Sequence, residues 1–171
     1  MIEPMTPADE SVVTAQLQRP PRGVAGVAHR CRCGKPDVVA TRPRLADGTP
    51  FPTMYYLTCP RAASACSTLE SQGRMASMAH RLSAEPDLAA AYARAHTAYL
   101  NDRSRLGAVG EIAGVSAGGM PDRVKCLHAL VGHALAAGPG VNPLGDDALA
   151  EIGPYWERPC LAAEAFATDS R

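Results

Sequence analysis

The chain has 171 residues, of which 46% are apolar and 20% are charged, and its formal net charge is zero. This length fits one domain, and this apolar share can bury a core without disulfides. No stretch approaches the roughly 20 apolar residues that span a bilayer, and residues 1–20 carry no signal-peptide pattern, so we expect a cytoplasmic protein with no membrane partner. In that compartment, six cysteines are expected to be thiols or metal ligands.

The N-terminal segment carries a helix start signal. Thr6 can cap a helix, Pro7 suits the first helical position, and acidic residues follow at once. We therefore expect residues 1–18 to form an N-terminal helix or a flexible arm. Residues 19–152 are expected to form a single α+β metal-binding domain, and residues 153–171 a C-terminal tail.

Three short strands are predicted near the start of the main domain, over residues 24–29, 37–45 and 53–58. A turn signal at Asp47-Gly48 connects the second and third strands. If the hairpin turns there, paired residue numbers sum to about 95–96 in antiparallel register. Cys59, which directly follows the third strand, would then lie opposite residue 36 or 37.

This register brings three cysteines together. Cys31 and Cys33 form a Cys-x-Cys-Gly turn between the first two strands, and Cys59 lies one strand spacing of about 4.8 Å away. Structural zinc sites commonly take four thiolate ligands in tetrahedral geometry. We therefore predict a zinc site at Cys31, Cys33 and Cys59, with an iron–sulfur cluster as the less favoured cofactor. The alternatives are buried thiols and redox chemistry.

Helices are predicted for most of the remaining chain. The first runs from Pro60 to about Ser83, with Gly73 kinking or dividing it. A second, capped by Ser83, runs to about Leu106. A third begins at Pro121 and ends near Ala137, and a short helix is expected over residues 146–152. The predicted fold is α+β: a small antiparallel three-stranded sheet with a cysteine knuckle, packed against three to four helices.

The fourth zinc ligand is expected on the helix predicted from Pro121. Cys126 and His128 are two residues apart and would point to opposite sides of a regular helix, so only one of them could join the site. We favour Cys126 because its predicted place near the helix N-terminus stabilises thiolate, with His128 as the alternative and His133 also open. Cys66 and Cys160 are interpreted as buried apolar thiols.

A glycine-rich loop precedes the same predicted helix. Gly118 and Gly119, followed by Arg123 and Lys125, could offer backbone N–H groups, the helix dipole and positive charge to an anion. The spacing does not match a Walker motif. The alternative is a flexible loop and a helix start with no ligand.

The charges are unevenly distributed. Residues 19–81 carry ten Lys or Arg against three acidic residues. A basic half of this kind could attract a phosphate-bearing ligand or nucleic acid. We favour the simpler interpretation, in which acidic ends of the chain neutralise this surface within the fold.

Several motifs together resemble a known family. They are Arg30-Cys31-x-Cys33-Gly34-x-Pro36, Asp47-Gly48-Thr49-Pro50-Phe51-Pro52-Thr53, Tyr56-Leu57-Thr58-Cys59-Pro60, Gly119-Met120-Pro121-x-Arg123-Val124-Lys125-Cys126-Leu127-His128 and Gly138-x-Gly140-Val141-Asn142-Pro143. In their order and in their residue identities, these motifs resemble those of domain-of-unknown-function family 501, which is widespread in actinobacteria. The resemblance covers roughly residues 19–150. The resemblance implies that the motif cysteines, His128 and His133 recur in the family. Through the genes near its members, it also implies a link to cell division or polyphosphate metabolism.

Three hypotheses for function follow. The first is a non-catalytic protein with a structural zinc site and a basic surface that binds a protein partner or a phosphate-bearing ligand. The second is a metal-dependent hydrolase acting on a phosphate compound, which requires an open coordination position. The third is a nucleic-acid-binding zinc module, which we favour less. The sequence does not decide whether the protein is an enzyme.

Overall fold

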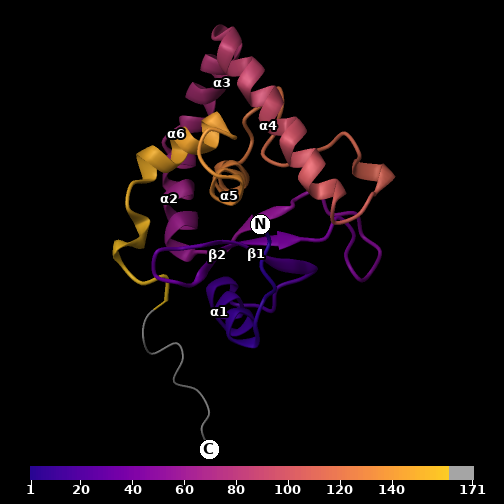
Figure 1. Ribbon diagram of the computed structural model, residues 1–171. Helices are drawn as coiled ribbons and strands as arrows, with labels where there is room; N and C mark the ends of the chain where they lie inside the picture. Colours follow the sequence, from indigo (N-terminus) through magenta and orange to yellow (C-terminus); the bar gives the residue numbers. More distant parts are fainter. Residues whose placement is uncertain (162–171) are drawn as a thin grey trace, which may run out of the picture.

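An antiparallel sheet of three strands lies between one helix and a larger group of helices, which confirms the α+β prediction (Figure 1). The computed structural model describes residues 1–161. Its elements in chain order are α1 (Pro7–Leu17), β1 (Val24–Arg30), β2 (Pro36–Thr41), β3 (Tyr55–Leu57), α2 (Pro60–Ser71), α3 (Arg74–Ala84), α4 (Pro86–Ser104), η1 (Gly110–Ile112), α5 (Leu127–Ala137), α6 (Pro143–Ile152) and η2 (Tyr155–Glu157). Within residues 1–161, no helix is long and apolar enough to cross a membrane.

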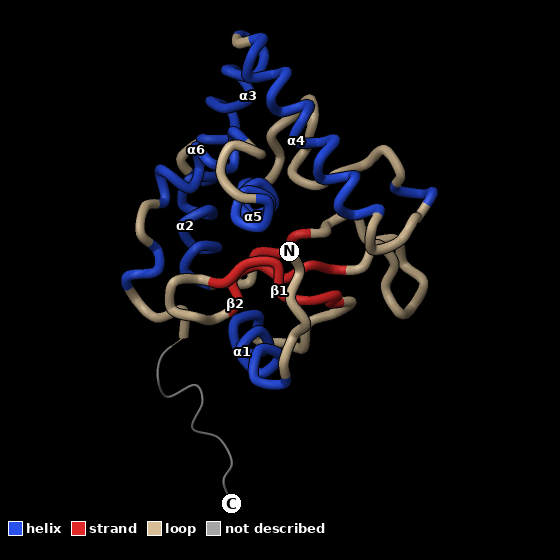
Figure 2. Tube along the Cα trace, in the orientation of Figure 1, coloured by secondary structure: helices blue, strands red, loops and turns tan. Residues whose placement is uncertain are grey.

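The strands, drawn in red in Figure 2, form one sheet. Its order is β1-β2-β3, with both pairs antiparallel. Val38 pairs with Leu57 and Val39 with Tyr56, so paired residue numbers sum to 95 and the predicted register is confirmed. Every residue of β2 is buried, because helices cover both faces of this central strand. The register places the end of β3, and with it the start of α2, beside the turn between β1 and β2.

The N-terminal helix α1 covers the sheet face opposite α5 (Figure 1). Thr6 caps it as predicted, in a capping box in which Thr6 Oγ accepts from the Asp9 N–H and the Asp9 carboxylate accepts from the Thr6 N–H. The helix docks through the fully buried Val13 and through Gln16, whose Nε2 donates to the carbonyl of Pro36 at 2.8 Å. The few apolar residues of α1 are therefore sufficient to dock the helix on the sheet, because the buried hydrogen bond of Gln16 adds to their packing.

Two helix boundaries follow from local backbone conformation. Gly73 adopts φ +80° between α2 and α3 and divides the predicted helix in two, because this conformation favours glycine and ends a regular helix. The predicted cap at Ser83 is wrong. Residue Glu85 is the N-cap of α4, Pro86 occupies its first turn, and the hydroxyl of Ser83 donates to the carbonyl of His80 instead.

The helix predicted from Pro121 starts later than expected. Residues 121–126 form a turn and an irregular segment, and α5 begins at Leu127, with Cys126 as an N-cap residue in extended conformation. The N–H groups of Arg123 and Lys125 donate to the carbonyls of Gly119 and Gly118, which closes the segment into a compact loop. Cys126 therefore lies outside the helix, so regular helix geometry does not place it and His128 on opposite sides.

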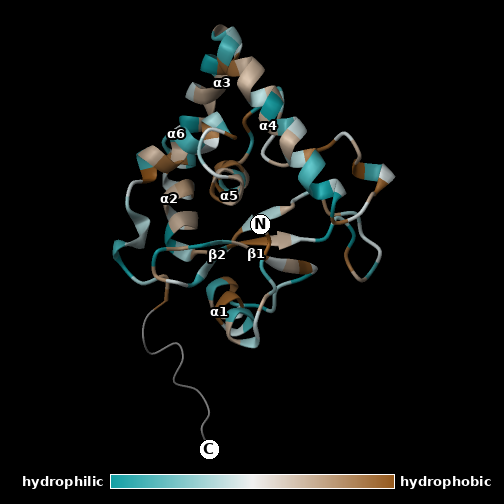
Figure 3. Ribbon diagram, viewed as in Figure 1, coloured by the Kyte–Doolittle hydropathy of each residue, from teal (hydrophilic) through white to brown (hydrophobic). Residues whose placement is uncertain are grey.

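The helix α5 lies at the centre of the molecule, between the sheet and the other helices, and is largely apolar (Figure 3). Its glycine, Gly132, permits close approach to β3: a Cβ there would lie 3.0 Å from the Tyr55 carbonyl oxygen. His133 is fully buried between the rings of Tyr55 and Tyr99. Its Nδ1 lies 3.1 Å from Nδ2 of Asn142, so this histidine is a core residue.

The same Asn142 begins α6. It is fully buried, and its Oδ1 accepts from the N–H of Gly145 at 3.0 Å, which caps the helix. Asn142 therefore explains the Val-Asn-Pro motif as a structural element: one side chain caps α6 and contacts the imidazole of α5.

The long loop after α4 is held by a buried arginine. Arg103 is 4% exposed, and its guanidinium donates to the carbonyls of Pro52, Ile112 and Val115. Hydrogen bonds to a charged donor are stronger than neutral ones, so this one side chain fastens the loop to the domain.

Candidate metal centre

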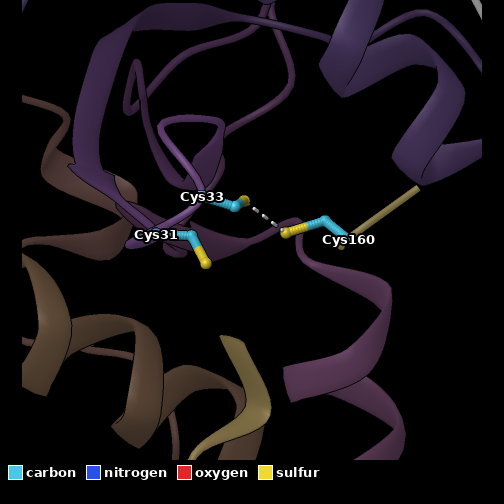
Figure 4. Close-up of side chains that lie close together, drawn as sticks. All are labelled: Cys31, Cys33 and Cys160. Atoms are coloured by element: carbon cyan, nitrogen blue, oxygen red, sulfur yellow. Dashed lines mark hydrogen bonds between the residues drawn. The ribbon is translucent and has the colours of Figure 1, made fainter. Parts of the chain in front are cut away.

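Four cysteines from three distant parts of the chain converge at one edge of the sheet. The Sγ atoms of Cys31, Cys33 and Cys160 all lie within 4.8 Å of one another (Figure 4). The Sγ of Cys160 is 3.3 Å from that of Cys33 and 3.5 Å from that of Cys59. Sulfurs around a tetrahedral zinc ion lie about 3.8 Å apart, given a Zn–S distance of about 2.3 Å. Cys59 is not part of the group of three sulfurs that all lie within 4.8 Å of one another, and it adjoins that group through Cys160. The sulfur distances from Cys160 to Cys33 and to Cys59 are close to those of a zinc-thiolate shell.

The turn between β1 and β2 presents the first two cysteines. The N–H of Cys31 donates to the carbonyl of Lys35 at 2.9 Å, and the N–H of Gly34 donates to the carbonyl of Cys31 at 2.8 Å. Gly34 has φ +82°, a conformation that a residue with a side chain rarely adopts. A tight knuckle therefore turns both side chains to the same side of the sheet edge.

The predicted hairpin register brings the third cysteine beside this knuckle. The N–H groups of Thr58 and Cys59 both donate to the carbonyl of Asp37, at 2.8 and 3.4 Å. Cys59 is then the N-cap residue of α2, and Pro60 opens the helix. The positive end of a helix therefore lies at a fully buried thiol, which favours its thiolate form.

The C-terminal segment after α6 supplies the fourth cysteine. Tyr155 donates its hydroxyl to the buried carboxylate of Asp37 at 2.8 Å. The Arg32 guanidinium lies 4.3 Å from the ring centre of Trp156, and Arg61 Nε donates to the carbonyl of Pro159 at 2.6 Å. These contacts hold Cys160 in place, and it is 6% exposed.

The four thiols have divergent acidities. The hydrogen bond with Cys160 lowers the pKa of Cys59 to about 7, against opposing desolvation and with help from the first backbone amides of α2. Burial raises the pKa of Cys33, but backbone hydrogen bonding from Lys35 and contacts with neighbouring sulfurs outweigh it, so the net shift is downward. Desolvation raises the pKa of Cys31, and the hydrogen bond with Cys59 raises that of Cys160. The pKa values of Cys33 and Cys59 are thus shifted downward and those of Cys31 and Cys160 upward, and a bound cation would favour the thiolate form of all four.

A second group of potential ligands lies between α2 and α5 and consists of Glu70, Cys126 and His128, whose ligand atoms lie within 4.8 Å of one another. The Sγ of Cys126 is 3.9 Å from Nδ1 of His128, and Oε1 of Glu70 is 3.2 Å from the same nitrogen. The hydrogen bond between the thiol and the imidazole lowers the pKa of Cys126 and raises the pKa of His128.

The predicted ligands therefore fall into two places. Cys31, Cys33 and Cys59 gather at the sheet edge, whereas Cys126 and His128 belong to the group with Glu70. The assignment of Cys126 or His128 as fourth ligand to the first group stays a prediction. His133 lies in the core against Tyr55. The anion site at Gly118, Gly119, Arg123 and Lys125 stays a prediction.

Sequence reasoning set Cys160 aside because it follows a segment without a helical or strand pattern. A signal for it did exist. Trp156 lies four residues earlier, and so large an aromatic side chain tends to anchor the segment that carries it, which makes Cys160 a candidate for an incomplete tetrahedral shell. Glu70 carried no such signal, because a single acidic residue on a polar helix face is common.

Ion pairs neutralise much of the Arg-rich half of the chain. Arg30 forms a bidentate ion pair with Asp9 and also contacts Glu3, so acidic residues of the N-terminal segment neutralise its charge. Among the residues that the structure describes, the other arginines of residues 19–81 that pair with a carboxylate are Arg22, Arg44, Arg74 and Arg81. These pairs favour the interpretation of a neutralised surface.

Fold and site define a small α+β protein with a candidate thiolate metal centre. The chain belongs to the family described as "Protein of unknown function (DUF501)", which matches residues 27–150, in agreement with the resemblance of the motifs. The match includes Cys31, Cys33, Cys59 and Cys126 and ends before Cys160. No curated protein and no solved structure matches this chain.

Proposed function

We propose that this protein binds one structural zinc ion through Cys31, Cys33, Cys59 and Cys160. The observation that carries the proposal is a group of three sulfurs, those of Cys31, Cys33 and Cys160, that all lie within 4.8 Å of one another. The sulfur of Cys59, at the start of α2, adjoins this group at 3.5 Å from that of Cys160. Borderline-soft zinc matches an all-thiolate donor set, and hard cations such as magnesium do not.

A structural role is favoured over a catalytic one. Four thiolates close the coordination shell of zinc, whereas catalytic sites keep a position open for water or substrate. Cys31, Cys59 and Cys160 are also almost fully buried, which limits access to the group. The ion would join the β1–β2 turn, the start of α2 and the C-terminal segment, so its binding energy would contribute to folding.

The surface charges bear on the partner. Because the arginines of the N-terminal half are mostly paired with carboxylates, the field available to a nucleic-acid backbone is reduced. We therefore favour a protein partner over nucleic acid for a domain that the zinc ion stabilises.

Metal content after chelator dialysis tests the assignment. The full chain, purified with zinc and dialysed against buffer containing EDTA, is expected to retain one zinc ion per chain by elemental analysis. Cys160→Ser is expected to retain much less than one, and Cys126→Ser, the matched cysteine control, is expected to retain one.

Two outcomes would refute the proposal. The first is a wild-type chain that folds and retains no metal. The second is the reverse pattern, in which Cys126→Ser loses the retained ion and Cys160→Ser keeps it, because that pattern would place Cys126 in the shell instead. Circular dichroism of each variant shows whether a variant that retains no metal is still folded.

A further inference from the structure

The group formed by Glu70, Cys126 and His128 lies apart from the cysteine cluster and has a different chemistry. Its donors are one carboxylate oxygen, one sulfur and one imidazole nitrogen, from the C-terminal part of α2 and the start of α5. All three side chains are partly exposed: the side chains of His128 and Glu70 are 31% and 22% accessible. Solvent can therefore reach a ligand bound there.

The directions of the three donors distinguish a metal site from a nucleophile with its base. In a nucleophile–base–acid triad, the two ring nitrogens of the histidine face the nucleophile and the acid separately. Here Sγ of Cys126 and Oε1 of Glu70 both approach Nδ1 of His128, at 3.9 and 3.2 Å. The three donor atoms all lie within 4.8 Å of one another, which is close enough for a cation to lie between them.

The surrounding contacts orient the donors. Nε2 of His128 lies 3.4 Å from the hydroxyl of Ser67, one turn before Glu70 on α2. Oε1 of Glu70 also accepts from the N–H of Leu127 at 2.7 Å, which holds the carboxylate at the first turn of α5. Outer contacts of this kind fix the orientation of metal-binding histidines and carboxylates.

We propose that Glu70, Cys126 and His128 form a second metal site, which takes a divalent transition ion of the zinc class and keeps one coordination position open to solvent. Three mixed protein ligands with a free position are the pattern of zinc sites that exchange ligands or activate water. The cysteine cluster at the sheet edge has four thiolates and no such position. The two sites therefore differ in affinity as well as in role, and the open site exchanges its ion more readily.

Equilibrium dialysis of the full chain against graded free Zn²⁺ tests this proposal. The wild-type chain is expected to bind an ion in addition to the one retained against EDTA. His128→Ala and Glu70→Gln are expected to lower the affinity for this additional ion at least tenfold while the retained ion stays. Glu70→Gln keeps a carbonyl oxygen for the Leu127 N–H, which preserves the local structure. His80→Ala removes an exposed histidine on α3 and is expected to change nothing.

Alkylation of Cys126 gives a second measurement. With the chain at fixed pH, Zn²⁺ is expected to slow labelling of Cys126 by iodoacetamide several-fold in the wild type but not in His128→Ala, as mapped by mass spectrometry. In the cobalt-loaded protein, added imidazole is expected to shift the visible absorption of the open site.

Three results would overturn the proposal. They are failure to bind an additional ion, equal affinity for that ion in the variants and the wild type, and labelling of Cys126 that is rapid and indifferent to zinc. The last result would indicate a thiol–imidazole pair without metal. An absorption spectrum insensitive to imidazole would refute the open position.

Discussion

Substitution of Gly145 by alanine provides a sharp test of how α5 and α6 pack. Gly145 lies in the first turn of α6, next to the buried Leu144. A Cβ added there would lie 2.3 Å from the carbonyl oxygen of Leu130 and 2.8 Å from Cβ of Ala134. Carbon–oxygen contacts rarely fall below about 3.3 Å, so α6 must move by roughly 1 Å to accept the methyl group.

The expected cost follows from this displacement. Overpacking of a dense core costs typically about 1–3 kcal/mol, and the displacement would also loosen the packing of Leu144 and Ala148. The better helix propensity of alanine offsets up to about 1 kcal/mol. We expect Gly145→Ala to lower the free energy of unfolding by about 2 kcal/mol, which for a domain of this size lowers Tm by roughly 6 °C.

Urea unfolding of the full chain, followed by circular dichroism, measures this effect. Gly110→Ala is the matched control, because Gly110 has negative φ and a Cβ there meets nothing within 4 Å. That variant is expected to be as stable as the wild type within about 1 kcal/mol. If Gly145→Ala is as stable as Gly110→Ala, the close contact between α5 and α6 is refuted.

Two further predictions concern buried polar side chains. Burial lowers the pKa of His133 to about 4, below its usual 6.5, so the neutral ring stabilises the fold above pH 6.5 and this stability is lost as pH falls through 4. The loss of stability is about 1.4 kcal/mol per pH unit, roughly 3 kcal/mol in all. NMR titration of the ring should give the low pKa of His133. A pKa near 6.5 would contradict the burial argument. Arg103→Ala should lower the free energy of unfolding by about 3 kcal/mol, measured in urea, because the carbonyls of Ile112 and Val115 lose their donor and that of Pro52 loses one of its two donors. An unchanged urea midpoint would show that Arg103 does not hold the loop.

The sheet could be predicted because its determinants are local. The Asp47-Gly48 turn fixes the register of β2 and β3, and the register alone places Cys59 beside the β1–β2 knuckle. Thr6 and Asp9 likewise carry the start of α1 in their side chains. In each case the interacting residues are close in sequence, so the sequence pattern is sufficient to predict their geometry.

The remaining features depend on contacts between distant residues. Cys160 reaches the cluster because Arg32, Arg61 and Asp37 hold the segment before it, and each of these contacts joins residues that are far apart in the sequence. The start of α5 was misplaced because Pro121 is a common first residue of a helix, whereas here the loop bonds back to Gly118 and Gly119. That shift of six residues also decides which side chains Cys126 can meet.

X-ray absorption at the zinc edge of the chelator-dialysed full chain tests the central claim most directly. Four sulfur ligands at about 2.3 Å are expected, since Cys31, Cys33, Cys59 and Cys160 supply only sulfur. A shell in which nitrogen or oxygen replaces sulfur, or a folded protein without zinc, would contradict the account.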